Sequence, residues 1–253
     1  MIKAIKIYGE RNSGTNYLEQ LIDQNLQVKI LKYRPNKLST SLLRTIKYDF
    51  VIDILSTMDK KNSLGWKHGC PRVKEINEFK KHPLVIVTIT KNPYSFLLSL
   101  HKKPYHFRGK KDPVFHNFIE QDWFLRNRDF CKGRYLESPI ELWNVKNKSY
   151  IHLSEKTFQI VINITYEQLI KNPEAIIDLI AKKGGIQVKK EEGFQNIVDS
   201  TKKSSLTFDD YKNYYLKKEW RKNLNNQAIG TINEKIDRSI IEYFKYQIIQ
   251  LEM

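Results

Sequence analysis

Residues 2–22 read IKAIKIYGERNSGTNYLEQLI, a pattern of strand, loop and helix. A buried strand over residues 2–8 is predicted by four apolar residues with few breakers between them: Ile2, Ala4, Ile5 and Ile7. Small and polar residues follow from Gly9 to Asn16. A helix over residues 14–25 is then predicted by apolar residues at helical spacing: Tyr17, Leu18, Leu21 and Ile22. A tight loop between a strand and a helix favours anion binding, because the first N–H groups of a helix have no partners within it.

The two glycines of this loop have the spacing of a nucleotide-binding P-loop. In that motif a Lys-Ser/Thr pair follows the second glycine, where the lysine reaches the β- and γ-phosphates and the hydroxyl binds Mg²⁺. Here Thr15-Asn16 follows Gly14 instead. The sequence therefore predicts an anion-binding loop without ordinary ATP or GTP hydrolysis. A plain turn between a strand and a helix is the alternative interpretation.

Alternating strand and helix patterns continue along the chain. Strand patterns occur at residues 2–8, about 49–54, 84–90 and 158–163. Helix patterns occur at residues 14–25, 93–101, 115–126, 137–147, 166–183 and 231–249. This alternation implies βαβ units, and hence a single α/β domain over residues 1–253 with a mainly parallel central sheet and helices on both faces.

Two segments depart from the alternation. Residues 102–135 are rich in Pro, Gly, aromatic and charged residues and are too long for a plain connection, which predicts an insertion over the site. Its aromatic and cationic residues suggest an acceptor surface: Tyr105, Phe107, Arg108 and Trp123. Residues 184–230 are polar and weakly periodic, which predicts a flap.

Composition indicates a protein with one sizeable core. The chain has 253 residues, of which 40% are hydrophobic, and contains no apolar run of about 18 residues that would span a membrane. No secretory signal pattern is present at its start. Two cysteines, Cys70 and Cys131, suggest neither a disulfide framework nor a metal cluster. A reducing, cytoplasmic setting is the simplest expectation from this cysteine usage.

The net charge of +16 makes a polyanion a candidate partner of this protein. A surplus of this size attracts nucleic acids by steering and counterion release. The lysines are spread along the chain, however, and no helix-turn-helix, zinc-finger or RNP pattern is present. A positive basin for a charged nucleotide, or simply a lysine-rich solvated surface, explains the surplus as well.

Five motifs follow one another along the chain. They are RNSGTNY at residues 11–17, Trp66-Lys67-His68, LVIVTITKNPYSFLLSLH at residues 84–101, Thr165-Tyr166-Glu167-Gln168-Leu169 with Asn172-Pro173, and Glu219-Trp220-Arg221 with Ile232-Asn233. In this order the sequence resembles the sulfotransferases that use 3′-phosphoadenosine 5′-phosphosulfate (PAPS), from residue 2 to about residue 240. The resemblance implies the P-loop-like α/β fold of that family.

The resemblance also implies a role for each motif residue. The loop would hold the 5′-phosphosulfate through its amides and side chains: Asn12, Ser13, Gly14, Thr15 and Asn16. Lys91 and Ser99 would bind the 3′-phosphate, and Trp220 with Arg221 would close over the nucleotide. Packing against the sheet is the alternative for Ser99, and a place in the core is the alternative for Trp220. Glu167 is expected to be structural, whereas Tyr166 is expected to line part of the pocket.

The remaining roles concern the chemical step. His68 is the candidate general base, because a histidine has a pKa suited to proton transfer at neutral pH. A backbone-bonded structural histidine is the alternative. The family has a lysine or arginine at the position of Asn12, which carries no charge, so Arg11 or Lys67 is expected to stabilise the leaving phosphate.

The predicted activity is transfer of a sulfuryl group from PAPS to a hydroxyl or amine, without a metal. The product of the donor is adenosine 3′,5′-bisphosphate. A saccharide and a small molecule are both candidate acceptors, and neither nucleic acid nor a membrane span is expected as the main partner. A P-loop kinase of a small molecule and a basic nucleic-acid-binding protein remain the alternatives.

Overall fold

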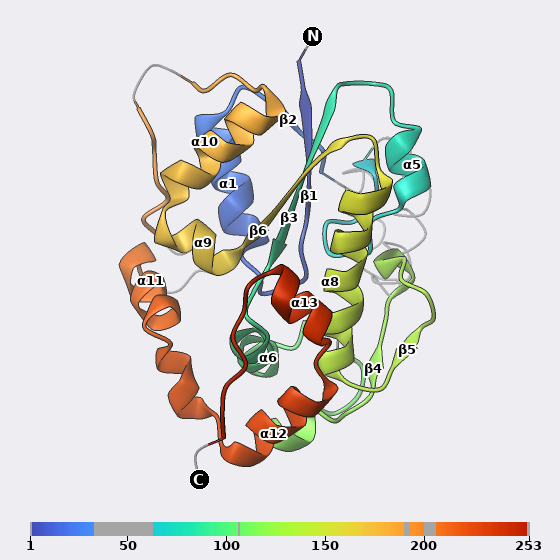
Figure 1. Ribbon diagram of the computed structural model, residues 1–253, viewed down its shortest axis with the longest axis vertical. Helices are drawn as coiled ribbons and strands as arrows, with labels where there is room; N and C mark the ends of the chain where they lie inside the picture. Colours follow the sequence, from blue (N-terminus) through green and yellow to red (C-terminus); the bar gives the residue numbers. More distant parts are fainter. Residues whose placement is uncertain (1, 33–62, 106, 190–192, 200–205, 252–253) are drawn as a thin grey trace, which may run out of the picture.

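The computed structural model describes residues 2–32, 63–105, 107–189, 193–199 and 206–251 (Figure 1). The strand predicted at about 49–54 lies outside these residues. The described part contains a four-stranded sheet with the order β2-β1-β3-β6, in which every neighbouring pair is parallel. The predicted α/β architecture with a parallel central sheet is therefore confirmed.

The strands of this sheet are short and apolar. They are β1 (Ala4–Tyr8), β2 (Lys29–Ile30), β3 (Leu84–Thr90) and β6 (Ile160–Thr165). All residues of β1 and β3 are buried, as expected for central strands of a parallel sheet that is covered on both faces. Tyr8 is paired with Thr88, and Thr90 with Thr165, so the strands end at the same edge.

Helices cover both faces of the sheet, as predicted. One face packs against α1 (Thr15–Asn25), α9 (Tyr166–Lys171) and α10 (Pro173–Gly184). The other packs against α5 (Val73–Asn77) and the C-terminal half of α8 (Pro139–Lys156). Figure 1 shows α1, α9 and α10 on one side of the strands and α5 and α8 on the other.

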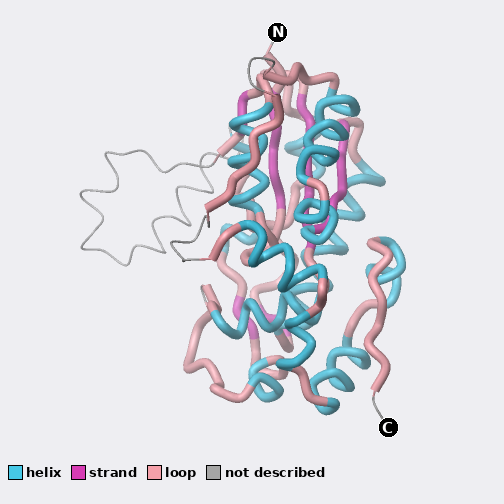
Figure 2. Tube along the Cα trace, turned by 90° about the vertical axis from the view of Figure 1, so that its left-hand side faces the viewer, coloured by secondary structure: helices cyan, strands magenta, loops and turns pink. Residues whose placement is uncertain are grey.

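A further apolar cluster lies beyond the carboxyl ends of the strands. It contains residues of α6 (Pro93–Lys102), α7 (Phe115–Phe118), the N-terminal half of α8, the hairpin of β4 (Trp123–Phe124) and β5 (Tyr135–Leu136), α12 (Asn226–Lys235) and α13 (Arg238–Tyr243). Figure 2 shows the long strands in the upper part of the molecule and this helical region below them. The edge at which the strands end thus lies between the two parts.

Several predicted helices differ in extent from those observed. The pattern at 115–126 is only partly helical, because the buried Trp123 belongs to β4 and pairs with Leu136. The pattern at 166–183 is divided at Asn172, whose side chain caps α10 before Pro173. The pattern at 231–249 is divided at Asp237, which caps α13 in the same manner.

The predicted insertion and flap contain short elements. Within residues 102–135 lie α7, the start of the hairpin and the 3₁₀ turn Asn127–Asp129. The described part of residues 184–230 contains α11 (Phe208–Leu216) and the 3₁₀ turn Glu219–Asn223.

The expectation that the two cysteines form no disulfide is wrong. Cys70 and Cys131 are bonded across 61 residues of sequence, because backbone contacts place residues 127–131 beside residues 66–70. The basis for expecting a reducing compartment is therefore removed, since persistent disulfides are typical of oxidising environments. No helix in the part of the chain described here has the length and apolar character needed to cross a membrane.

Candidate active site

The sheet has a topological switch point between β1 and β3. The chain leaves β1 towards β2 on one side, whereas β6 lies on the opposite side of β3. Open α/β sheets bind ligands at such a point, outside the carboxyl ends of the strands. Here the Gly9–Asn16 loop follows β1, and Lys91 follows β3.

The loop after β1 has the backbone of an anion-binding turn. Asn12 and Gly14 both have positive φ angles, of 66° and 87°, and Ser13 N donates to Glu10 O at 3.2 Å between them. Among the described residues, no side chain caps the start of α1. The N–H groups of Thr15, Asn16 and Tyr17 therefore have no side-chain cap at this helix N-terminus, where the helix dipole also favours an anion.

Gly14 is required here for two separate reasons. Its φ of +87° lies in the left-handed region, and a Cβ at this position would lie 2.4 Å from Tyr166 Cδ2. Left-handed backbone costs a residue other than glycine about 1–3 kcal/mol. The clash would in addition push the Tyr166 ring out of its place against the loop.

We therefore expect Gly14→Ala to lower the melting temperature by several degrees, at about 2–4 °C per kcal/mol, and to weaken anion binding. Gly193→Ala is the matched control, because Gly193 has a φ of +72° and a Cβ added there would meet no described atom within 4 Å. Scanning calorimetry of the two variants separates the cost of the backbone angle from that of the contact. Equal melting temperatures would show that the Tyr166 contact is unimportant.

The segment that carries His68 is bound to the end of β1 by several hydrogen bonds. Lys6 Nζ donates to Ser63 O and Gly65 O at 2.6 and 2.5 Å, and Tyr8 Oη donates to Leu64 O at 2.6 Å. Gly9 N then donates to Lys67 O at 2.9 Å. The buried polar side chains of β1 thus explain why residues 63–68 lie beside the loop.

His68, the candidate base, lies at the start of the loop. Its Nδ1 lies 2.7 Å from Gly9 O, and since a carbonyl only accepts, Nδ1 carries the proton of the neutral ring. The lone pair of the neutral ring is therefore on Nε2. Burial, followed by the positive charge of Arg11, holds the pKa of His68 well below its usual value of 6.5, so the ring is neutral at pH 7.

The two predicted cations at the loop have different surroundings. Arg11 is buried, its Nη1 lies 2.7 Å from Glu10 Oε1, and its guanidinium lies 4.3 Å from the centre of the Trp66 ring. In the described part of the chain, Arg11 Nε and Nη2 have no hydrogen-bond acceptor. Lys67 is more exposed, and its Nζ donates to Asn16 Oδ1 at 2.6 Å and contacts Glu19 Oε2 at 3.0 Å. Both cations therefore adjoin the loop, although neither replaces a P-loop lysine in sequence.

The side chain of Asn12 is directed to a different segment. Its Nδ2 donates to Lys103 O at 3.3 Å, so it links the loop to the end of α6. Ser13 and Thr15 are buried in the turn. Asn16 offers its carbonyl oxygen to Lys67, which leaves its amide hydrogens to other partners.

Lys91 and Ser99, both of the motif at residues 84–101, lie together. Lys91 Nζ donates to Ser99 Oγ at 2.9 Å and lies 3.8 Å from the centre of the Tyr215 ring. Asn92 caps α6 and Pro93 is its first residue, so Ser99 lies about two turns into the helix. Burial lowers the pKa of Lys91 to about 7, although the nearby Glu167 carboxylate opposes the shift.

Glu167 has the structural contacts expected of it. Its Oε1 accepts from Asn92 N at 3.0 Å and its Oε2 from Tyr246 Oη at 2.9 Å. It therefore holds the chain directly after Lys91.

A pocket joins the loop to Lys91. Asn12 and Gly14 form one wall and Lys91 another. Aromatic side chains from α1, α9 and α11 line much of the remainder: Tyr17, Tyr166, Phe208, Tyr211 and Tyr215. A cavity with a cation, a helix N-terminus and aromatic rings suits a flat base that carries phosphate groups.

Sequence reasoning missed the contribution of α11 to this cavity. A usable signal was present, because Phe208, Tyr211 and Tyr215 recur at helical spacing and share one face. Trp220, in contrast, is 3% exposed and stacks on Tyr94 in the apolar cluster below the sheet. It does not line the cavity, which agrees with the alternative interpretation of a core residue. Arg221 is exposed on the 3₁₀ turn beside it.

The aromatic residues of the predicted insertion serve different purposes. Phe107 packs against Phe118 and Trp123, both of which are buried. Tyr105 and Arg108 are both exposed. Within the described ranges, no three metal-binding side chains of His, Cys, Asp or Glu are grouped.

Comparisons with known proteins identify similar solved structures. No family model and no curated protein matches the chain. The sulfotransferase domain from the curacin biosynthetic pathway matches 98% of this chain and 99% of its own, with a TM-score of 0.48 and 12% identity. Mouse sulfotransferase SULT7A1 complexed with PAP matches 95% and 89%, with a TM-score of 0.44 and 16% identity. A sulfotransferase from Alicyclobacillus acidocaldarius matches 98% and 97%, with a TM-score of 0.45 and 11% identity.

All of these proteins are sulfotransferases.

Proposed function

We propose that this protein transfers a sulfuryl group from PAPS to a hydroxyl or amine of an acceptor. The observation that carries the proposal is the position of three groups around one switch point. These are a loop with an uncapped helix start, the neutral His68 at its beginning, and the Lys91–Ser99 pair, whose Lys91 Nζ also lies 3.4 Å from Asn12 O of the loop. A donor that carries a phosphosulfate and a second phosphate on one adenosine would use the loop amides and Lys91 as its anion-binding groups.

In the proposed complex, the loop amides hold the 5′-phosphosulfate and Lys91 with Ser99 holds the 3′-phosphate. The adenine lies among the aromatic side chains of the cavity, where rings stack on any flat base. In this complex Tyr211 and Tyr215 of α11, which line the cavity, take the role first expected of Trp220 and Arg221.

The proposed reaction is an in-line displacement at sulfur. The acceptor oxygen or nitrogen forms a bond to sulfur while the bond from sulfur to the bridging phosphate oxygen breaks. His68 Nε2 takes the proton of the acceptor, and the electron pair of the broken bond leaves with adenosine 3′,5′-bisphosphate. Loop amides, together with Arg11 and Lys67, stabilise the charge that develops on the leaving phosphate.

Ligand stabilisation of the folded protein tests the proposal against its alternatives. A ligand that binds only the native state raises the melting temperature with its concentration. Adenosine 3′,5′-bisphosphate is expected to do so, by about 2.7 kcal/mol of stability at 100 times its Kd, whereas ATP and GTP with Mg²⁺ are not. A shift with ATP and Mg²⁺ alone would favour a kinase, and tighter binding of random DNA than of the bisphosphate would favour a nucleic-acid-binding protein.

Product analysis then identifies the acceptor. Incubation with PAPS and candidate saccharides, small metabolites or peptides is followed by mass spectrometry. Release of adenosine 3′,5′-bisphosphate together with a sulfated product supports the proposal. Binding of the bisphosphate without release from PAPS in the presence of any candidate would leave a nucleotide-binding protein in its place.

A further inference from the structure

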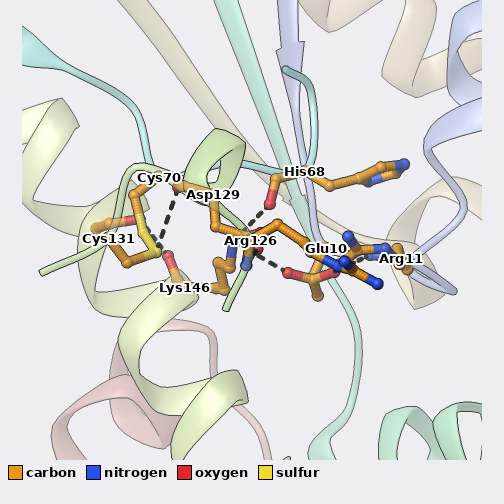
Figure 3. The surroundings of a disulfide bond; sticks show 9 residues. Glu10, Arg11, His68, Cys70, Arg126, Asp129, Cys131 and Lys146 are labelled. Carbon is orange, nitrogen blue, oxygen red and sulfur yellow. Dashed lines mark hydrogen bonds and ion pairs between the residues drawn. A yellow bond between two sulfur atoms is a disulfide. The ribbon is translucent and has the colours of Figure 1, made fainter. Parts of the chain in front are cut away.

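A completely buried lysine connects three parts of the candidate active site. Lys146, on α8, has a side chain with 0% exposure. Its Nζ donates to His68 O at 2.6 Å and to Asp129 Oδ1 at 2.7 Å, and lies 3.3 Å from Glu10 Oε2 (Figure 3).

Through these contacts Lys146 is linked both to the proposed base, His68, and to the loop cation, Arg11. Glu10 accepts from Arg11 N and from Arg11 Nη1, each at 2.7 Å, so it holds the backbone and the guanidinium of the cation at the loop. The carbonyl of His68 belongs to the residue whose ring contacts Gly9 O. One ammonium group thus holds the backbone of the base and, through Glu10, the cation.

Asp129, the third partner of Lys146, lies beside the Cys70–Cys131 disulfide. Asp129 O accepts from Cys70 N at 2.5 Å and lies 3.4 Å from Cys131 Sγ, and Asp129 Oδ2 accepts from Arg126 N at 2.7 Å. Figure 3 shows the Cys70–Cys131 bond beside this residue. The bond therefore joins residue 70, two positions after His68, to the turn that presents Asp129 to Lys146.

Stability alone is a poor explanation for this arrangement. Burying charges is costly, and replacing a buried ion pair with apolar side chains of similar volume is often neutral or stabilising. A buried ammonium with three oxygen partners instead fixes direction, because each contact constrains the position of a different segment. The geometry that it fixes is that of the base and the loop cation.

We propose that Lys146 is a positioning residue for sulfuryl transfer, and that the Cys70–Cys131 disulfide keeps its partner Asp129 in place. This role rests on the proposed function, because it concerns the orientation of His68 and Arg11. It concerns turnover and not nucleotide affinity, since the cavity with Lys91 is lined by other residues.

The main variant is Lys146→Met, which keeps the length of the side chain and removes the ammonium. Lys148→Met is the matched control on the same helix, since Lys148 is 74% exposed and has a 3.5 Å ion pair with Asp237. Lys146→Met is expected to lower kcat at least about tenfold while the Kd for adenosine 3′,5′-bisphosphate stays within about threefold. Lys148→Met is expected to change neither.

The pH profile distinguishes positioning from a purely structural role. The charged groups facing His68 are Arg11, Lys67 and Lys146, and each opposes its protonation. Removing the Lys146 charge should therefore move the acid limb of the kcat profile to higher pH. A variant that is merely less stable would keep the limb of the wild-type protein.

Reduction of the disulfide provides a second measurement on the unaltered chain. Reduced protein, or the Cys131→Ser variant, is expected to lose kcat in the same direction as Lys146→Met and to keep its Kd for the bisphosphate. Reoxidation should restore the wild-type protein but not Cys131→Ser. If Lys146→Met does not fold, Asp129→Asn replaces it, because it removes one of the charges facing the ammonium and conserves the shape of the side chain.

NMR titration of the His68 ring makes the outcome independent of turnover. If wild-type protein transfers no sulfuryl group to any acceptor, the proposed function fails, and the His68 pKa in Lys146→Met and Lys148→Met still tests the contact. A pKa that rises only in Lys146→Met supports the positioning role. An unchanged His68 pKa, or a kcat within about threefold of wild type in folded Lys146→Met and Asp129→Asn, would overturn it.

Discussion

Replacement of His68 by asparagine is expected to lower kcat by about 100- to 10,000-fold, the usual contribution of a general base. The asparagine Nδ2 can still donate to Gly9 O in place of His68 Nδ1, so the contact with the loop is kept while the basic Nε2 is lost. The Kd for adenosine 3′,5′-bisphosphate should stay within about threefold of the wild-type value. Single-turnover kinetics with PAPS and isothermal titration calorimetry with the bisphosphate measure the two quantities.

His152→Asn is the control for this experiment, because His152 is exposed on α8 and contributes nothing to the cavity. It should have wild-type kinetics. The depressed pKa of His68 means that the wild-type ring is already neutral at pH 7 and that kcat declines only well below pH 6.5. A wild-type rate for His68→Asn would reject the assignment of the base and leave His68 as a structural residue bonded to the loop.

Substitution of Lys91 by methionine is expected to weaken binding of the bisphosphate by roughly ten- to a hundredfold. A hydrogen bond to a charged group contributes about 1.5–3 kcal/mol, and each 1.4 kcal/mol is a factor of ten in Kd. Lys171→Met is the control, since Lys171 is exposed at the end of α9 and does not line the cavity. An unchanged Kd for Lys91→Met would remove Lys91 from the nucleotide site.

The same lysine should make nucleotide affinity depend on pH. The pKa of Lys91 is about 7 in the free protein, and a bound phosphate raises it because the anion favours the charged ammonium. Binding must therefore take up a proton above pH 7. The Kd should increase with pH, approaching tenfold per unit above pH 7, until the pKa of the bound state is passed. Calorimetry in buffers of different ionisation enthalpy measures this proton uptake.

Lys91→Arg separates this effect from titration of the phosphate itself. An arginine remains charged throughout the range, so the increase in Kd above pH 7 should disappear in this variant. If the wild-type Kd is constant between pH 7 and pH 9, the ammonium of Lys91 does not contact the phosphate.

Local patterns in the sequence were sufficient for much of the fold. The apolar residues of β1 and β3 and the cap at Asn92-Pro93 act over a few neighbouring residues, so their effect is visible without the tertiary structure. Helix ends at Asn172 and Asp237 were missed although both have capping side chains, because the apolar spacing continues across them.

Contacts between distant segments account for what sequence reasoning missed. The core position of Trp220 depends on its stacking against Tyr94, which lies far earlier in the chain. The aromatic face of α11 lines the cavity only because α11 packs against α9. The Cys70–Cys131 bond depends on residues 127–131 lying beside residues 66–70, a pairing that two cysteines alone do not reveal.

The sequence by itself determined the parallel α/β sheet, the turn and helix start after β1 and the Lys91–Ser99 pair, since each depends on residues within a few turns or strands of one another. Only the tertiary structure decided which cations adjoin the loop, which aromatic rings line the cavity and which buried lysine holds His68. Those contacts join residues separated by many positions, and their energies depend on burial and direction, which arise only when the layers pack together.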